Sequence, residues 1–223
     1  MQEKALTYLD KTTWGPGQWQ DEPDKVQWAD EATGLPCLAV RHPELGNWCG
    51  YVGVPEGHPL FGVRWDSCYL SDAQEKGERP GDDVLPDVPE FLLAGTPLPE
   101  RMVLFERTQK VCGAENCADQ HTPAGLLMAH HGVNFSAPCQ EDDREHGICH
   151  VPDPGEPDNL WWFGFDCGHC GDHSPKLAAE MMKISPDTRT VLNSYETYRT
   201  LPYVRAVCSM LAGQLAAIGR GDR

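Results

Sequence analysis

A dense group of potential metal ligands follows an aromatic segment late in the chain. Residues 161–165 read WWFGF, which is typical of a buried strand. The glycine-rich turn after it carries Asp166, Cys167, His169, Cys170, Asp172 and His173. Cysteine, histidine and carboxylate side chains are the groups that bind zinc in proteins. A strand that fixes the position of such a turn therefore predicts a metal site at its end.

Further candidate ligands lie upstream, on segments expected to be neighbouring strands. The first set drawn from them contains Cys139, Cys149, Cys167 and His169. It would fill a tetrahedron with protein atoms, which is typical of a structural zinc site. The second set contains His130, His150, His169 and Asp172. It would leave a position for water, as catalytic zinc does. The alternative is that these residues are buried thiols and hydrogen-bonded histidines.

Two histidines are adjacent in the segment 126–136, which we interpret as a strand. Neighbouring residues of a strand point to opposite faces of the sheet. We therefore expect at most one of His130 and His131 to reach any one site.

Another group of potential ligands contains Cys112, Cys117 and His121. They lie in a loop over 108–123 that has no core of its own, and a local zinc ion could hold such a loop together. Three donors leave the set incomplete, so ordinary surface thiols are the alternative.

Candidate acid and base groups lie on the turn PEGHP at 55–59. Glu56 and His58 could move a proton if this loop folds over the ligand cluster, and Asp172 is a third candidate. The alternative for His58 is a structural hydrogen bond to the backbone. The chain has no HExxH, phosphate-binding loop, GxSxG or dinucleotide-binding glycine motif.

The expected elements place these residues in an α+β fold. Segments 37–40 and 48–54 predict a β-hairpin, and Ser174-Pro175 predicts the start of a helix over 176–183. Apolar residues at helical spacing over 201–218 predict an amphipathic helix that packs on the sheet, with Cys208 as a core thiol. We expect a mixed or antiparallel sheet in a single domain over 1–223, with a surface loop at 71–90.

Composition narrows the classes of partner. The chain has 223 residues and a net charge of −16, so direct binding to a nucleic-acid backbone is disfavoured. Neither a secretory signal nor a stretch of membrane-spanning length is evident, which favours a cytoplasmic location without a membrane partner. Ten cysteines and nine histidines in a reducing compartment indicate metal binding more than disulfides.

Several long motifs resemble a family of uncharacterised proteins of tailed phages. They are WGPGQWQDEPD at 14–24, TGLPCL at 33–38, WCGYVGVPEGHP at 48–59 and WWFGFDCGH at 161–169. The segment 198–215 is similar too, so the resemblance covers nearly the whole chain. It implies an accessory phage protein made in the cytoplasm of a bacterial host.

The resemblance also ranks the candidate ligands. It indicates Cys167, His169 and Asp172 as recurring donors and favours His130, because His131 occupies a position where the family tends to have glycine. Cys170 and His173 are additions of this sequence and rank second. The loop with Cys112, Cys117 and His121 has the character of an insertion.

Three hypotheses for function follow. The first is a small zinc-dependent hydrolase of a nucleotide-type small molecule. The second is a non-catalytic binding protein with structural zinc that sequesters or inhibits a host factor or a defence signal. The third is an acidic decoy that covers a basic host surface. The partner would accordingly be a small-molecule ligand or a host protein that the sequence does not identify.

Overall fold

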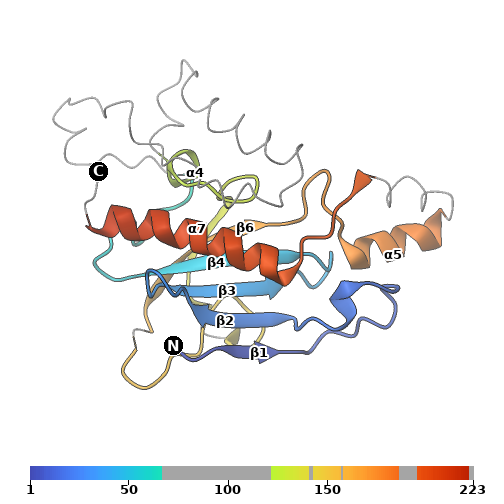
Figure 1. Ribbon diagram of the computed structural model, residues 1–223, viewed down its shortest axis with the longest axis horizontal. Helices are drawn as coiled ribbons and strands as arrows, with labels where there is room; N and C mark the ends of the chain where they lie inside the picture. Colours follow the sequence, from blue (N-terminus) through green and yellow to red (C-terminus); the bar gives the residue numbers. More distant parts are fainter. Residues whose placement is uncertain (67–121, 141–142, 157, 186–194, 221–223) are drawn as a thin grey trace, which may run out of the picture.

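An antiparallel sheet is the central element of the computed structural model, which describes residues 1–66, 122–140, 143–156, 158–185 and 195–220 (Figure 1). The strands are β1 (Lys4–Leu6), β2 (Lys25–Ala29), β3 (Pro36–Arg41), β4 (Trp48–Pro55), β5 (Phe135–Pro138) and β6 (Leu160–Asp166). The helices are η1 (Gln18–Gln20), α4 (Pro123–Leu126), α5 (Pro175–Ile184) and α7 (Leu201–Arg220).

The strand order is β1-β2-β3-β4-β6-β5, and every neighbouring pair is antiparallel. The predicted α+β fold with a C-terminal helix on the sheet is confirmed. The predicted hairpin is β3–β4, and the aromatic segment is β6, which pairs along the other side of β4. Strand β6 is therefore held between β4 and β5, and the turn after it starts from a fixed position.

Two glycines allow β4 and β6 to carry large rings at neighbouring positions. Gly50 pairs with Phe165, and a Cβ atom on Gly50 would lie 2.3 Å from the Phe165 ring. Tyr51 pairs with Gly164 in the same way, and a Cβ atom on Gly164 would lie 2.3 Å from the Tyr51 ring. Each ring thus lies across the backbone of the opposite strand, and this interlocking specifies the register of the strand that leads to the candidate site.

Both faces of the sheet are buried, by different parts of the chain. In β3, Cys37 and Ala39 belong to the apolar cluster beneath α7, whereas Leu38 and Val40 belong to a second cluster on the other face. Cys139 packs against this second cluster. Side chains alternate along a strand, so the position of a metal-ligating residue in its strand determines on which of the two faces its side chain lies.

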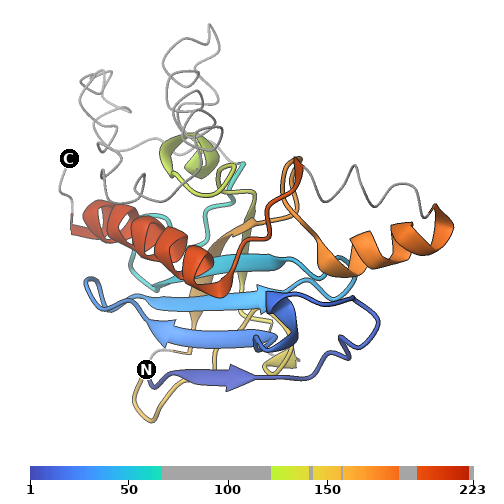
Figure 2. The same ribbon diagram turned by 45° about the vertical axis from the view of Figure 1, so that its right-hand side comes forward.

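Helix α7 covers the first face along β3 and β4 (Figure 1). Its buried residues recur at helical spacing and are Val204, Val207, Cys208, Leu211, Ala212 and Leu215. The Cys208 thiol contacts the Leu38 and Tyr51 carbonyls, and burial raises its pKa, so the predicted core thiol is confirmed. Helix α5 is confirmed as well, and it extends away from the sheet beyond the N-terminal end of α7 (Figure 2).

Residues Leu201–Gly219 of α7 are long and apolar enough to cross a membrane by length and composition. The expectation that no stretch reaches this length is wrong on that criterion. The finding is weak evidence for a membrane span, because a helix that packs on the core of a domain passes the same test.

Some expected elements differ from the structure. Strands β1 and β2 were not predicted, and the segment 126–136 is not one strand: it contains the end of α4, a turn at His130–His131 and the first residues of β5. The expected loop at 71–90 lies outside the described residues.

Candidate metal centre

Four potential ligands meet where β6 ends, beside the N-terminal end of α7. Their donor atoms all lie within 4.8 Å of one another, and they belong to His130, His131, His169 and Asp172. They come from two segments, the turn that precedes β5 and the turn that follows β6. The prediction that ligand-type side chains converge in this region is confirmed, and the identity of a metal stays a prediction.

Asp172 is the most constrained member of the group. Its side chain is buried, and Oδ1 accepts a hydrogen bond from Arg199 Nε at 2.7 Å. Oδ2 accepts from the His169 backbone amide at 3.1 Å and lies 2.7 Å from His130 Nε2. A backbone bridge to Thr197 holds the same segment against the residues that precede α7. The carboxylate is therefore oriented by the protein before any ligand arrives.

His130 is buried and has a partner on each ring nitrogen. Nε2 faces Asp172, and Nδ1 lies 2.7 Å from the Tyr203 hydroxyl. A carboxylate only accepts, so a neutral ring must donate from Nε2 and accept at Nδ1 from the tyrosine. Burial raises the pKa of Tyr203, which keeps its hydroxyl protonated as the donor. Tyr203, Arg199 and Asp172 together orient the His130 ring.

His131 joins the same group, contrary to the expectation from strand alternation. It lies in a turn with φ of 54°, in the left-handed region that residues other than glycine rarely adopt. This backbone geometry brings the two rings to one side, with centroids 4.6 Å apart. The His131 ring also stacks on His169 at 4.4 Å. The alternation rule was wrong here because it holds for strands and not for a left-handed turn.

His169 carries a buried ring nitrogen for which the described part of the chain supplies no hydrogen-bond partner. Nδ1 lies 3.4 Å from Asp166 Oδ1 and 3.9 Å from Asp172 Oδ2, and no group of the described residues donates to it or accepts from it within hydrogen-bond geometry. Buried polar atoms of this kind are uncommon and are often explained by an ion or a water molecule. Asp166 itself is oriented by the Asn134 side chain at 2.5 Å and the Gly168 amide at 2.9 Å.

The geometry of the four donors fits a tetrahedral cation after a small adjustment. Zinc binds imidazole nitrogen at about 2.0–2.1 Å, so donors at the corners of its tetrahedron lie roughly 3.3 Å apart. The donors here all lie within 4.8 Å of one another, and His130 and Asp172 would separate slightly from their present 2.7 Å. To bind the cation through Nε2, the neutral His130 ring would carry its proton on Nδ1, which can donate to the Tyr203 hydroxyl oxygen. His131 and His169 are half-buried, so their side chains are less enclosed than those of His130 and Asp172. Three imidazoles and a carboxylate are a suitable donor set for zinc.

Cys167 does not belong to the group, although it lies between β6 and His169. Its side chain is buried in the cluster beneath α7, and its amide donates to the Trp48 carbonyl at 2.9 Å. Burial is the main reason that the Cys167 pKa is raised well above its usual value. A thiol that resists ionisation is a poor metal ligand, so the structure favours a core role for this residue.

The predicted ligands Cys139, Cys149 and His150 form a separate group on the opposite face of the sheet. Cys139 and Cys149 are joined as a disulfide, and the Trp162 indole donates to Cys139 Sγ at 3.3 Å. Neither of the two sets drawn from the sequence is assembled, because each combined residues from both faces. The expectation of metal in place of disulfides is wrong for this pair in the structure described here.

Glu56 and His58 lie away from the group, in the turn that follows β4. His58 Nε2 donates to the Leu215 carbonyl at 2.8 Å, and Nδ1 accepts from the Leu60 amide at 3.1 Å. Leu215 and Tyr203 are twelve positions apart on α7, which corresponds to about 18 Å along a helix. Glu56 is exposed. The structure therefore does not bring these two residues to the four ligands and gives His58 a role in holding α7.

Acid is expected to break the hydrogen bond that His58 Nδ1 accepts from the Leu60 amide. Burial lowers the pKa of His58 below 6.5, so the folded state favours the neutral ring that accepts from Leu60. Its contribution to stability is complete above the unfolded pKa of about 6.5 and is lost as the pH falls through the folded value. We expect His58→Gln to reduce the loss of unfolding free energy between about pH 7.5 and 5.5, measured by urea denaturation. Exposed His146→Gln is the control, and an equal reduction in that variant would contradict the assignment.

The second-rank candidates lie elsewhere. Cys170 is exposed, and His173 Nδ1 pairs with Glu196 at 3.1 Å while its ring packs near Trp19. Cys112, Cys117 and His121 lie outside the described residues.

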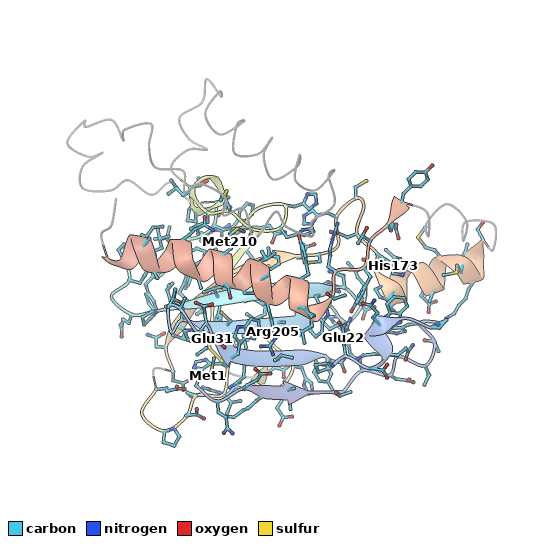
Figure 3. The ribbon with its side chains drawn as sticks, in the orientation of Figure 1. Met1, Glu22, Glu31, His173, Arg205 and Met210 are labelled. Carbon is cyan, nitrogen blue, oxygen red and sulfur yellow. A yellow bond between two sulfur atoms is a disulfide. The ribbon has the colours of Figure 1, made fainter. Side chains whose placement is uncertain are left out.

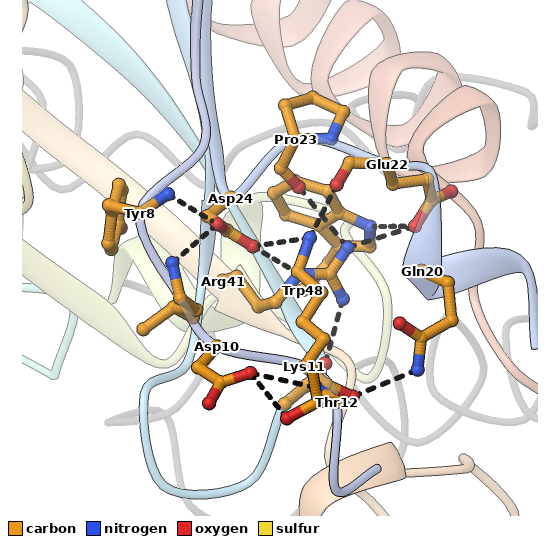
Figure 4. Close-up of polar contacts among 12 residues, drawn as sticks. Tyr8, Asp10, Lys11, Thr12, Gln20, Glu22, Pro23, Asp24, Arg41 and Trp48 are labelled. Carbon is orange, nitrogen blue, oxygen red and sulfur yellow. Dashed lines mark hydrogen bonds and ion pairs between the residues drawn. The ribbon is translucent and has the colours of Figure 1, made fainter. Parts of the chain in front are cut away.

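A buried polar network beside the site was not predicted (Figure 4). The side chain of Arg41 is fully buried, lies over the Trp48 ring and contacts Glu22 at 3.0 Å and Asp24 at 3.3 Å. Glu22 lies under the N-terminal end of α7 (Figure 3), where it accepts from the Leu201 amide at 3.0 Å. The network therefore links the N-terminal segment and β3 to the start of α7.

One connection runs from this network to the candidate centre. Tyr198 donates to Glu22, and Arg41 donates to the Tyr198 hydroxyl at 2.9 Å. The next residue, Arg199, holds Asp172. Glu22 and Asp24 entered the sequence analysis only as part of the motif at 14–24, so this link was not predicted.

Comparison of the chain with protein-family models, curated proteins and solved structures finds no match. The assignment of function therefore depends on the geometry of the site.

Proposed function

We propose that this protein is a small metal-dependent hydrolase whose divalent cation, most simply zinc, is held by the group His130, His131, His169 and Asp172. The observation that carries the proposal is the convergence of three imidazoles and one carboxylate from two distant segments. A buried nitrogen of His169 also has no hydrogen-bond partner among the residues that the structure describes. A zinc ion in such a site lowers the pKa of a bound water and makes it a nucleophile at neutral pH.

The division of the group into a buried and a half-buried part supports a catalytic role. His130 and Asp172 are fixed from behind by Tyr203 and Arg199. His131 and His169 form the side that solvent and a small molecule can reach. If the cation binds one of these two imidazoles only weakly, water can take that coordination position.

Asp166 is the best candidate to take a proton from that water. Its carboxylate is 3.4 Å from His169, and its side chain is about a third exposed, at 34 %. The Asn134 amide and the Gly168 amide hold it in place. In this role Asp166 replaces Glu56 and His58, which lie away from the four ligands. The nucleotide-type substrate stays a prediction.

A second candidate, a binding protein with structural zinc, is favoured by one observation. The chain offers four donors, which are enough to close a tetrahedron without water. The two functions differ in whether the bound metal accepts a further ligand.

Metal titration of the protein and of His131→Gly tests the proposal. We expect the wild type to bind one Zn²⁺ and His131→Gly to bind it about 10–100-fold more weakly, by calorimetry with a competing chelator. Glycine suits the φ of 54° at this position, so the metal-free variant should melt no lower than the wild type. An unchanged zinc affinity in His131→Gly would remove this residue from the site.

Cobalt substitution then separates the two functions. The hydrolase predicts that azide or thiocyanate changes the visible spectrum of the Co²⁺ protein, because an open position accepts the anion. A spectrum that is insensitive to these anions would support the structural site and contradict the hydrolase.

A further inference from the structure

We propose that Cys139 and Cys149 are a reversible dithiol–disulfide pair that exchanges with low-molecular-weight disulfides, with Cys139 as the sulfur that meets the substrate. This inference concerns the face of the sheet opposite α7 and does not depend on the metal centre.

The two sulfurs differ in access. Cys139 follows the last residue of β5, an edge strand of the described sheet, and is half-buried. Cys149 is completely buried. An incoming disulfide can therefore reach Cys139 and not Cys149, so Cys149 is suited to attack the mixed disulfide from inside the protein.

Two neighbours of Cys139 favour its thiolate. The Trp162 indole N–H points to Cys139 Sγ at 3.3 Å, and His150 Nδ1 lies 3.8 Å from the same sulfur. A hydrogen-bond donor stabilises the thiolate, and an imidazole can take the thiol proton, which together lower a thiol pKa. Cys149 is separated from Cys139 by ten positions and is directly followed by His150.

The loop between the cysteines is held by contacts other than the disulfide. Lys25 Nζ donates to the Arg144 and Gly147 carbonyls at 2.6 and 2.8 Å. Gln27 exchanges two hydrogen bonds with the Val151 backbone at 2.9 and 3.0 Å. These contacts keep the loop on β2 when the disulfide opens, so the pair can be reduced and re-formed without unfolding the domain.

The exchange has two steps, each an attack of a thiolate on a disulfide sulfur. The Cys139 thiolate attacks one sulfur of a substrate RSSR, the substrate bond breaks, and RS⁻ leaves and takes up a proton. Cys149 then loses its proton and attacks the Cys139 sulfur of the mixed disulfide, which releases the second RS⁻. The protein pair is oxidised by two electrons, and one RSSR is reduced to two RSH. The reverse sequence, driven by excess thiol, reduces the protein.

The experiment treats the reduced full-length protein with glutathione disulfide and follows each cysteine by mass spectrometry after an acid quench. In Cys149→Ser we expect glutathione to accumulate on Cys139 about tenfold faster than on Cys170, an exposed thiol in the same chain. In the wild type we expect the Cys139–Cys149 disulfide and release of two glutathiones. Equal or slower reaction at Cys139 than at Cys170 would overturn the proposal.

Trp162→Phe keeps an aromatic ring at this position and removes the N–H donor. The reaction of Cys139 should slow severalfold in this variant while that of Cys170 stays the same, and an unchanged Cys139 rate would count against the proposed role of the indole. A competing role is zinc binding by the reduced Cys139, Cys149 and His150. If the reduced wild type binds one more zinc than Cys149→Ser does, and that zinc protects Cys139 from glutathione disulfide, this group is a metal site and the exchange proposal is wrong.

Discussion

Replacement of Arg41 by methionine is expected to lower the free energy of unfolding by about 3–5 kcal/mol, because it leaves buried carboxylates without their cation. Arg41 is fully buried and bonds Glu22 at 3.0 Å (Figure 4). The loss would be measured by urea denaturation at neutral pH. Methionine is similar in length and keeps part of the contact with the Trp48 ring, so the change reports mainly on charge and hydrogen bonding.

Arg64→Met is the matched control. Arg64 also bonds a carboxylate through two nitrogens, at 2.9 Å each to Asp66, but its side chain is 67 % exposed. An exposed pair of this kind contributes about 0–1 kcal/mol. If Arg41→Met and Arg64→Met lower the free energy of unfolding by the same small amount, burial does not make the Arg41 ion pairs more stabilising than an exposed pair.

Arg41→Met should also disturb the candidate metal centre. Glu22 accepts from the Leu201 amide at the start of α7 and from Tyr198, the residue before Arg199. Loss of Arg41 frees this segment, which positions Asp172 through Arg199. The network and the metal centre are therefore expected to weaken together.

Local patterns in the sequence were sufficient for the elements that frame the site. The hairpin β3–β4, strand β6 and helices α5 and α7 each carry a clear apolar or capping signal, and all are present. Strand β2 was missed because Lys25 and Gln27 are polar and yet buried. Their side chains bond loop carbonyls that come from more than a hundred residues away. A local pattern cannot contain that information.

The candidate site was partly predictable, because some of its residues follow a local pattern and others depend on contacts between distant segments. His169 and Asp172 were identified by their position after a buried strand, and His130 by its place in a group of ligands. A rule for strands allowed only one of His130 and His131, and the family resemblance favoured His130, although His131 lies in a left-handed turn that brings its ring to the same site. The sets that mixed Cys139 with His169 failed because the sequence does not state which face of the sheet the segment after β5 covers.

Asp172→Asn is expected to remove the response of the protein to zinc and to destabilise the metal-free fold by about 3 kcal/mol. Arg199, His130 and the His169 backbone amide all donate to the two oxygens of the Asp172 carboxylate. An asparagine side chain has only one oxygen, so it cannot accept at both positions. One of these donors would face the new NH₂ group, and the buried Arg199 would lose its counter-charge. Thermal melts with and without zinc measure both effects.

Asp166→Asn separates the loss of a ligand from the loss of a proton acceptor. Asp166 is partly exposed, and an asparagine oxygen can still accept from the Gly168 amide. The exposed Asn134 side chain can turn its own oxygen toward the new NH₂ group, so metal-free stability should change by less than about 1 kcal/mol. A ligand that binds only the folded state raises the melting temperature in proportion to the logarithm of its concentration over its Kd. Zinc should therefore stabilise Asp166→Asn as it does the wild type, whereas it should leave Asp172→Asn unchanged. Asp166→Asn should hydrolyse a nucleotide-type substrate more slowly than the wild type does, although it still binds the metal. If zinc raises the melting temperature of Asp172→Asn as much as that of the wild type, the carboxylate is not a ligand, and its bonds to His130 and Arg199 serve the fold alone.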